Sequence, residues 1–244
     1  PCLVFSRVLF RSIAHVKTRF VGNKTLFEYD QVQNRLARLQ ANFSICSAFC
    51  HKSAQVADLE NDLFPVGLEA NIIKTVTADM MQESSQSLLQ LFGGKGYRLN
   101  HIAGRSTVDS RPFQIFEGSN DMLYQKIADA FLKLMKEAKE TQLYNFLKTY
   151  VPLVAQRLRK ICNFELDNQL PQRKLIELGQ FVSRIYAMQL VAEMEGRGFR
   201  SDLSENALDI LTHDVANFIS SLRRSQTSLL VDDYGQKSNW FELA

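Results

Sequence analysis

The residues best suited to chemistry lie in two short stretches. One is Gln-Leu-Phe-Gly-Gly-Lys-Gly-Tyr from Gln90, and the other is Asp-Ser-Arg-Pro-Phe-Gln-Ile-Phe-Glu-Gly-Ser-Asn-Asp from Asp109, which places Glu117 directly before Gly118. A carboxylate can act as a general base, and a neighbouring glycine lets the backbone approach a ligand closely. An isolated carboxylate at this place is more often a solvated loop residue stabilised by the next helix dipole, so the surrounding pattern must decide.

Other kinds of site have weaker support. The glycine-rich stretch matches neither a phosphate-binding loop nor a dinucleotide fingerprint, because its spacing differs and no strand precedes it. Cys46 and Cys50 lie one helical turn apart beside His51, a spacing that could hold a metal ion. No second pair of ligands accompanies them, so we expect no metal site. We interpret the four cysteines as buried thiols of a reducing compartment.

Composition narrows the class of protein. The chain has 45% hydrophobic and 23% charged residues, as is usual for a globular domain, and a net charge of +3. The sequence contains no dense run of Lys and Arg, so it does not predict nucleic-acid binding. No segment reaches the roughly 18 uncharged apolar residues that a membrane span requires, so we predict no transmembrane segment.

The elements that must position the two stretches have helical periodicity. Apolar residues recur every three or four positions over residues 26–54 and again over 68–92, where Gly93 ends the pattern. Residues 93–112 are rich in Gly, Ser, Asn and Asp, which predicts a loop. Ser119 and Asn120 are both good N-caps for a helix that runs to about residue 139.

The rest of the chain is also predicted to be helical, and strand signals are nearly absent. The fold class is therefore all-α, a helical bundle followed by a second, smaller helical layer. We interpret the first twelve residues as a non-native leader, because their pattern fits poorly with that of the neighbouring residues. The predicted helices of the second layer cover residues 141–162, 170–195 and 204–224. The predicted units are residues 1–12, 13–140 and 141–244.

Taken together, the two stretches resemble the acyl-CoA dehydrogenase family. That family ends a long helix with Gln, two residues and Gly-Gly-x-Gly-Tyr, and about twenty residues later has Asp-x-Arg, then Ile, an aromatic residue and Glu-Gly-Thr or Glu-Gly-Ser. Residues 90–97, Asp109, Arg111 and 115–119 match in order and spacing. The resemblance covers roughly residues 13–138 and implies the family's C-terminal helical bundle. The tail resembles the long-chain and very-long-chain branch, which has an extra helical domain.

The resemblance implies α,β-dehydrogenation of a fatty acyl-CoA with FAD as cofactor. Glu117 matches the base that removes the α-proton while a hydride leaves the β-carbon for flavin N5. Phe116 and Gly118 match positions beside the substrate. Burial against flavin and acyl chain would make the carboxylate a stronger base, and its own backbone N–H would help to polarise the thioester carbonyl.

The resemblance also implies which residues contact the flavin. An arginine fork suits the pyrophosphate, and Arg19 matches that position, although it lies three residues before Gly22 where the family usually has four. Some of these contacts reach a flavin held mainly by a neighbouring subunit, so a homodimer or tetramer is expected. The implied cofactor-binding residues are Arg19, Gln90, Gly93, Gly94, Ser119 and Asp121.

The family's amino-terminal helical domain and middle β-domain have no counterpart in these residues, so we expect the chain alone to be inactive. An electron-transfer flavoprotein is the implied acceptor, and the implied compartment is the bacterial cytoplasm or the mitochondrial matrix. Three alternatives stay open: an acyl-CoA oxidase with the same base, a helical scaffold that has lost catalysis, and an unrelated helical hairpin protein.

Overall fold

The computed structural model describes residues 2–56, 67–224 and 230. These residues form nine α-helices, short 3₁₀ turns and one two-stranded hairpin of two residues per strand, so the all-α prediction is confirmed. No helix among them has the length and apolarity that a membrane crossing needs.

The first layer contains α1 (Cys2–Thr18), α2 (Asp30–Val56) and α3 (Gly67–Phe92). Between α1 and α2 lie the antiparallel strands β1 (Phe20–Val21) and β2 (Lys24–Thr25), followed by the 3₁₀ turn η1 (Leu26–Glu28). The two long helices lie where the apolar periodicity predicts them. The break expected over residues 58–67 falls almost entirely outside the described residues.

The structure does not separate the predicted leader from the rest of the first helix. The predicted boundary after residue 12 falls inside α1, which continues unbroken to Thr18. Val8 and Leu9 before the boundary and Val16 after it lie in one hydrophobic cluster with Leu36 of α2. The predicted boundary at residue 12 therefore lies within one continuous helix, and both halves of that helix bury apolar side chains against the same neighbours.

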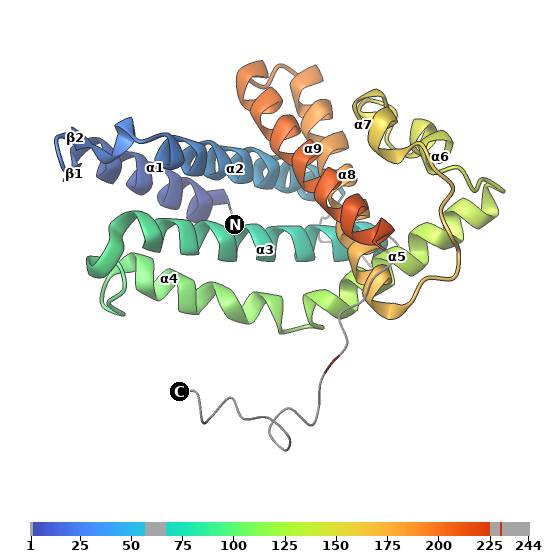
Figure 1. Cartoon of the computed structure of the whole chain (residues 1–244), viewed down its shortest axis with the longest axis horizontal. Coiled ribbons are helices and arrows are strands. Elements are labelled where there is room, and N and C mark those ends of the chain that lie inside the picture. Colours follow the sequence, from blue (N-terminus) through green and yellow to red (C-terminus); the bar gives the residue numbers. More distant parts are fainter. Residues whose placement is uncertain (1, 57–66, 225–229, 231–244) are drawn as a thin grey trace, which may run out of the picture.

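The loop predicted over residues 93–112 is also wrong. It contains the turn η3 (Gly93–Lys95) and the helix α4 (Ile102–Ser110), which lies along α3 (Figure 1). The His101 side chain accepts a hydrogen bond from the backbone N–H of Ala103 at 3.2 Å and caps α4. Packing against α3 thus overrides a local composition that favours a loop.

The remaining helices agree with the prediction with one exception. The turn η4 (Arg111–Gln114) leads to α5 (Asn120–Glu137), capped by Ser119 as expected. The single helix predicted over residues 141–162 is two helices, because Pro152 has no N–H to donate and interrupts the ladder. The other bounds are α6 (Leu143–Tyr150), α7 (Ala155–Cys162), α8 (Gln172–Gly196) and α9 (Ser201–Arg223).

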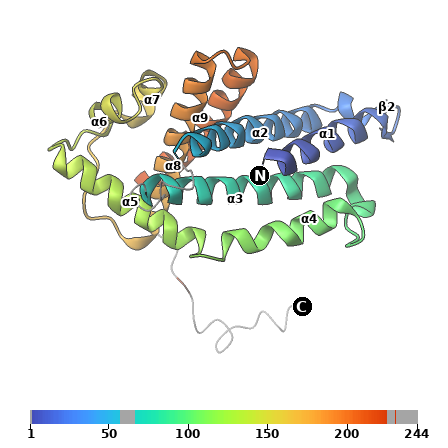
Figure 2. The ribbon, with the colours of Figure 1, turned by 180° about the vertical axis from the view of Figure 1, so that it is seen from behind.

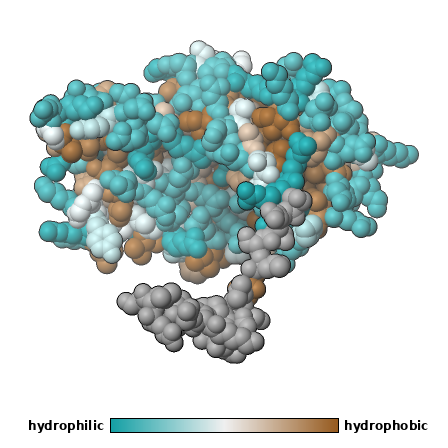
Figure 3. All heavy atoms as spheres, in the orientation of Figure 1, coloured by the Kyte–Doolittle hydropathy of each residue, from teal (hydrophilic) through white to brown (hydrophobic). Residues whose placement is uncertain are grey.

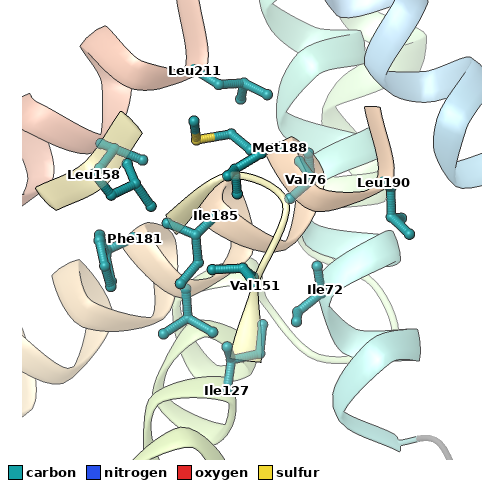
Figure 4. Close-up of a cluster of buried hydrophobic side chains, with 14 of the residues drawn as sticks. Ile72, Val76, Ile127, Val151, Leu158, Phe181, Ile185, Met188, Leu190 and Leu211 are labelled. Carbon is teal, nitrogen blue, oxygen red and sulfur yellow. The ribbon is translucent and has the colours of Figure 1, made fainter. Parts of the chain in front are cut away.

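The second layer shares its core with the first. α8 and α9 cross the direction of α2 and α3, and α6 and α7 lie beside them (Figures 1 and 2). Ile127 of α5, Phe181 and Ile185 of α8 and Leu211 of α9 meet in one buried cluster with Val76 of α3 (Figure 4). Residues on both sides of the predicted boundary at 140 therefore contribute to one hydrophobic core.

The outer surface is mostly hydrophilic on the face shown in Figure 3, with hydrophobic patches between the polar side chains. Large apolar side chains are also exposed around α4 and the segment between α4 and α5. This exposed set comprises Tyr97, Leu99, Ile102, Val108, Phe113, Ile115 and Phe116.

Candidate functional site

Glu117 lies in the tight turn between η4 and α5. Its φ angle is 57°, and the φ angle of Gly118 is 94°, so both residues adopt left-handed conformations. This region is open to glycine but is uncommon for other residues, and it persists only where the surroundings hold the backbone in place. The Glu117 side chain is exposed. The turn thus presents a carboxylate at the surface on a constrained backbone.

Two charged residues of α3 hold this turn. The ammonium of Lys74 donates to the carbonyl oxygen of Gly118 at 2.9 Å and to Oδ1 of Asn120 at 2.8 Å. Asn120 in turn donates through Nδ2 to Oδ1 of Asp79 at 2.6 Å. Burial lowers the pKa of Lys74, while the nearby carboxylates of Asp79 and Glu117 raise it.

Asp79 accepts hydrogen bonds from residues at both ends of the turn. Its Oδ1 also accepts a hydrogen bond from Gln114 Nε2 at 2.7 Å, and its Oδ2 accepts one from the Tyr124 hydroxyl at 2.5 Å. Burial raises the pKa of Tyr124 well above its ordinary value, so this hydroxyl stays protonated and able to donate. Neither Lys74 nor Asp79 was predicted as a site residue from the sequence. The signal that could have indicated them is the presence of two charged residues beside the apolar stripe of α3.

An apolar cavity of about 470 Å³ lies against the turn. Thr77, Ala78 and Met81 of α3 form part of its wall, and Phe113 and Phe116 contribute aromatic rings. Ligand sites are typically concave and apolar with a few polar groups that fix orientation. Here the charged groups are those of Lys74 and Glu117, which also line the cavity. The predicted substrate residue Phe116 therefore lies beside the predicted base.

A second, more polar pocket of about 190 Å³ adjoins the same turn. Two predicted cofactor residues, Ser119 and Asp121, line this pocket together with Arg111. Gln180 also lines it from α8, which shows that the second helical layer reaches the turn. The sequence offers no signal for Gln180, because its position depends on how α8 crosses α5.

The other predicted cofactor residues lie at the opposite end of α3. Gln90 comes sixteen positions after Lys74 on the same helix, which corresponds to about 24 Å at 1.5 Å per residue. Gly93 and Gly94 lie just past the end of α3, and both are exposed. Arg19 comes directly after α1, whose His15 ring stacks on Phe92 at 3.9 Å between centroids. The structure thus divides the six residues into two separate groups.

The group at the end of α3 combines exposed glycine backbone with nearby basic side chains. Gly93 has a φ angle of 61°, and an added Cβ there would meet no atom within 4 Å, so its backbone is open to a ligand. Burial lowers the pKa of His15, the hydrogen bond with the Leu91 backbone raises it, and the nearby Arg19 and Lys95 lower it further. Open glycine backbone surrounded by basic side chains fits the pyrophosphate of a dinucleotide.

The cysteines differ in part from the prediction. Cys46 and Cys162 are buried thiols, and burial raises the pKa of Cys162 to about 12. Cys50 is disulfide-bonded, so its interpretation as a thiol is wrong. Within the described residues, no group of three or more His, Cys, Asp or Glu side chains could hold a metal ion.

Comparison with known families identifies the fold and its motif. The model of the acyl-CoA dehydrogenase C-terminal domain matches residues 2–132, more than half of the chain. The chain belongs to the acyl-CoA dehydrogenase family. The match begins inside α1, within the segment predicted to be a leader, and ends inside α5.

Relatives of this acyl-CoA dehydrogenase domain are distant in sequence. The mitochondrial long-chain specific acyl-CoA dehydrogenase of Sus scrofa is 26% identical over 114 residues, which are 47% of this chain and 26% of that protein. The chain therefore spans about a quarter of the length of this curated relative.

Solved structures support the fold over a longer range. An acyl-CoA dehydrogenase from Bacillus anthracis complexed with FAD has a TM-score of 0.64 at 17% identity, and the match covers 90% of this chain and 45% of that one. ACDH-11 of Caenorhabditis elegans in complex with C11-CoA has a TM-score of 0.50 at 15% identity, covering 91% and 42%. At such identities the likeness shows the fold alone, and it extends over helices beyond residue 140.

Proposed function

We propose that the chain is the C-terminal part of a flavin-dependent acyl-CoA dehydrogenase in which Glu117 removes the α-proton of a fatty acyl-CoA. The observation that carries this proposal is the position of Glu117, on a constrained turn that lines an apolar cavity. The cavity is apolar enough to bind part of an acyl chain, and the Glu117 carboxylate beside it can act as the base. Phe116 contributes an aromatic wall, and Gly118 lets the substrate approach the backbone.

The residues of the chain fit FAD in two places. FAD, when bound, accepts the hydride that leaves the β-carbon. Ser119 and Asp121 line the polar pocket at the Glu117 turn, where they would contact the flavin of the same subunit. Arg19, Gln90, Gly93 and Gly94 would contact the pyrophosphate and adenosine part of a flavin held mainly by a neighbouring subunit.

The separation of about 24 Å along α3 is consistent with sites that cross between subunits. A homodimer or tetramer would then be the active form, because each complete site needs residues from two chains. A mixed assembly tests this arrangement. Subunits with Glu117→Gln and subunits with Arg19→Ala are each expected to be impaired alone, and mixing them should restore part of the activity.

Known relatives support the substrate and cofactor classes. A structural neighbour contains FAD, another contains C11-CoA, and the pig relative is long-chain specific and mitochondrial. We accordingly propose a fatty acyl-CoA substrate, an electron-transfer flavoprotein as acceptor, and the mitochondrial matrix or bacterial cytoplasm as compartment.

Flavin bleaching tests the proposed reaction. Palmitoyl-CoA is added anaerobically to the complete FAD-loaded enzyme, as wild type, as Glu117→Gln and as the control Glu137→Gln, which changes an exposed carboxylate at the end of α5. Loss of a general base is expected to slow bleaching by about 10²–10⁴-fold in Glu117→Gln only. Equal bleaching in all three proteins would place the base elsewhere, and no bleaching in any of them would indicate a catalytically silent relative.

The isolated 244-residue chain is expected to bind FAD weakly and to turn over no substrate. The two groups of proposed cofactor contacts are exposed, apart from the partly buried Ser119, and they are distant from each other, so neither alone encloses a flavin. Absorbance of the purified chain after gel filtration with FAD measures this. A stoichiometric flavin complex that reduces a dye would contradict the proposal.

A further inference from the structure

We propose that Lys74 of α3 is a positioning residue for Glu117, clamping the turn that carries the base together with Asp79. This inference rests on the proposed function, since it gives Lys74 a role in the reaction assigned to Glu117. The two residues lie five positions apart on one helix and reach the turn at both of its ends.

Lys74 holds the backbone of the turn. Its ammonium bonds the Gly118 carbonyl and the Asn120 side chain, at 2.9 and 2.8 Å. The first contact fixes the carbonyl group of Gly118, the residue after Glu117, and the second fixes the side chain of Asn120, the first residue of α5. Because Glu117 has the left-handed conformation that non-glycine residues rarely adopt, the turn needs such restraint to keep its carboxylate in one direction.

Asp79 closes the clamp from the other side. Its Oδ1 accepts hydrogen bonds from Gln114, three residues before Glu117, and from Asn120, three residues after it. Hydrogen bonds to a charged acceptor are shorter and stronger than neutral ones. One carboxylate on α3 therefore ties together the two ends of the segment that contains the base.

The second helical layer supports this arrangement. Arg184 of α8 is only 6% exposed, and it lies close enough to Tyr124 and Asp79 to interact with both electrostatically. At the same crossing, α8 approaches α5 so closely that a Cβ on Gly179 would lie 1.9 Å from the Tyr124 carbonyl oxygen. α8 thus packs directly against Tyr124, whose hydroxyl donates a hydrogen bond to Asp79.

The placement of Lys74 also affects charge. Lys74 lines the cavity together with Glu117, so its positive charge lies near the carboxylate and near any acyl thioester that binds there. A group that acts only through such placement should influence the rate of proton removal more than the binding of substrate.

The test compares Lys74→Met with Lys74→Arg in the complete FAD-loaded enzyme. Methionine keeps the apolar stem and removes both hydrogen bonds and the charge, whereas arginine keeps the charge and donors. The control is Lys133→Met, which removes a lysine that is 77% exposed on α5. The readouts are FAD content, the rate of flavin reduction at saturating palmitoyl-CoA, and the concentration for half-maximal rate.

We expect Lys74→Met to lower the saturating rate by about 10–100-fold, since small misplacements of catalytic groups have effects of this size. FAD content should be unchanged, and the half-saturating concentration should stay within about threefold. Lys74→Arg should recover most of the rate, and Lys133→Met should equal the wild type. A wild-type rate in Lys74→Met, or a loss no larger than its loss of bound FAD, would overturn the proposal.

Two further variants keep the outcomes separable. If Lys74→Met does not fold, Gln114→Ala cuts one arm of the clamp at a partly exposed residue, and an unchanged rate there would overturn the proposal. Glu117→Gln is measured in the same assay. Full bleaching in that variant would refute the proposed base, whereas loss of bleaching combined with a normal Lys74→Met would refute the clamp alone.

Discussion

The Glu117 turn and the buried cluster under α8 are held together by opposite means. The turn is exposed, its backbone is in a left-handed conformation, and charged hydrogen bonds from α3 restrain it. The cluster around Phe181, Ile185 and Met188 is closed to solvent and almost entirely apolar (Figure 4). Directional polar contacts can fix an exposed carboxylate in one orientation, whereas non-directional apolar burial supplies stability.

α3 belongs to both regions. Ile72, Val76 and Met80 face the hydrophobic core, while Lys74 and Asp79 contact the turn. This division predicts that substitutions in the core lower stability without changing the chemistry of the folded enzyme. Substitutions at the turn should change the chemistry of the folded enzyme and have a smaller effect on its stability.

The largest expected effect on stability is that of Phe181→Ala. Phe181 is fully buried, and truncating a buried phenylalanine costs about 3–5 kcal/mol through lost transfer energy and the cavity left behind. Urea unfolding of the chain followed by circular dichroism measures the change. In the complete enzyme, the rate of flavin reduction per bound FAD should equal the wild type. A large drop in that rate would break the separation between core and turn.

The next largest effect is expected for Gly179→Ala. The added Cβ would lie 1.9 Å from the Tyr124 carbonyl oxygen, so α5 and α8 must move apart. Overpacking of this kind costs about 1–3 kcal/mol. We expect a cost at the upper end, because the added Cβ would meet backbone atoms, which cannot rotate away. Gly196→Ala on the same helix is the control, because its Cβ would meet no atom within 4 Å. Equal stabilities of the two variants in urea would contradict the close crossing.

Gly118→Ala should affect the turn more than the fold. The φ angle of 94° disfavours any side chain, which costs on the order of 1–3 kcal/mol locally. Because the backbone beside Glu117 must shift, flavin reduction in the complete enzyme is expected to fall by about tenfold or more. A normal rate combined with lower stability would show that the turn tolerates displacement.

The smallest effect is expected for Lys133→Ala. Lys133 and Glu137 form an exposed pair one turn apart on α5 with 3.9 Å between nitrogen and oxygen. Such pairs contribute about 0.3–0.5 kcal/mol, so both the urea midpoint and the rate should stay near those of the wild type. A loss comparable with that of Phe181→Ala would mean that surface charges matter far more here than apolar burial.

Several features of the site depend on neighbouring residues in the chain. Gly93 ends α3 in a left-handed conformation and Ser119 caps α5, as their residue types predict. The spacing from Gln90 to Glu117 led to the family that the domain match confirms. Such features are predictable because each depends on a few consecutive residues or on a motif with fixed spacing.

Other features depend on contacts that local sequence does not encode. α4 forms where composition predicts a loop, because packing on α3 stabilises it. The predicted cofactor residues separate into two groups because α3 runs as one long helix between them.

The sequence by itself determined that the chain is helical, where its longest helices lie and which family its motif resembles. The tertiary structure decided that Lys74 and Asp79 form hydrogen bonds with the Glu117 turn, about forty positions away in the chain, and that α8 packs against Tyr124. The physical reason is that periodicity and capping act within one or two helical turns, whereas the partners of a side chain across a helix crossing depend on how all the helices pack.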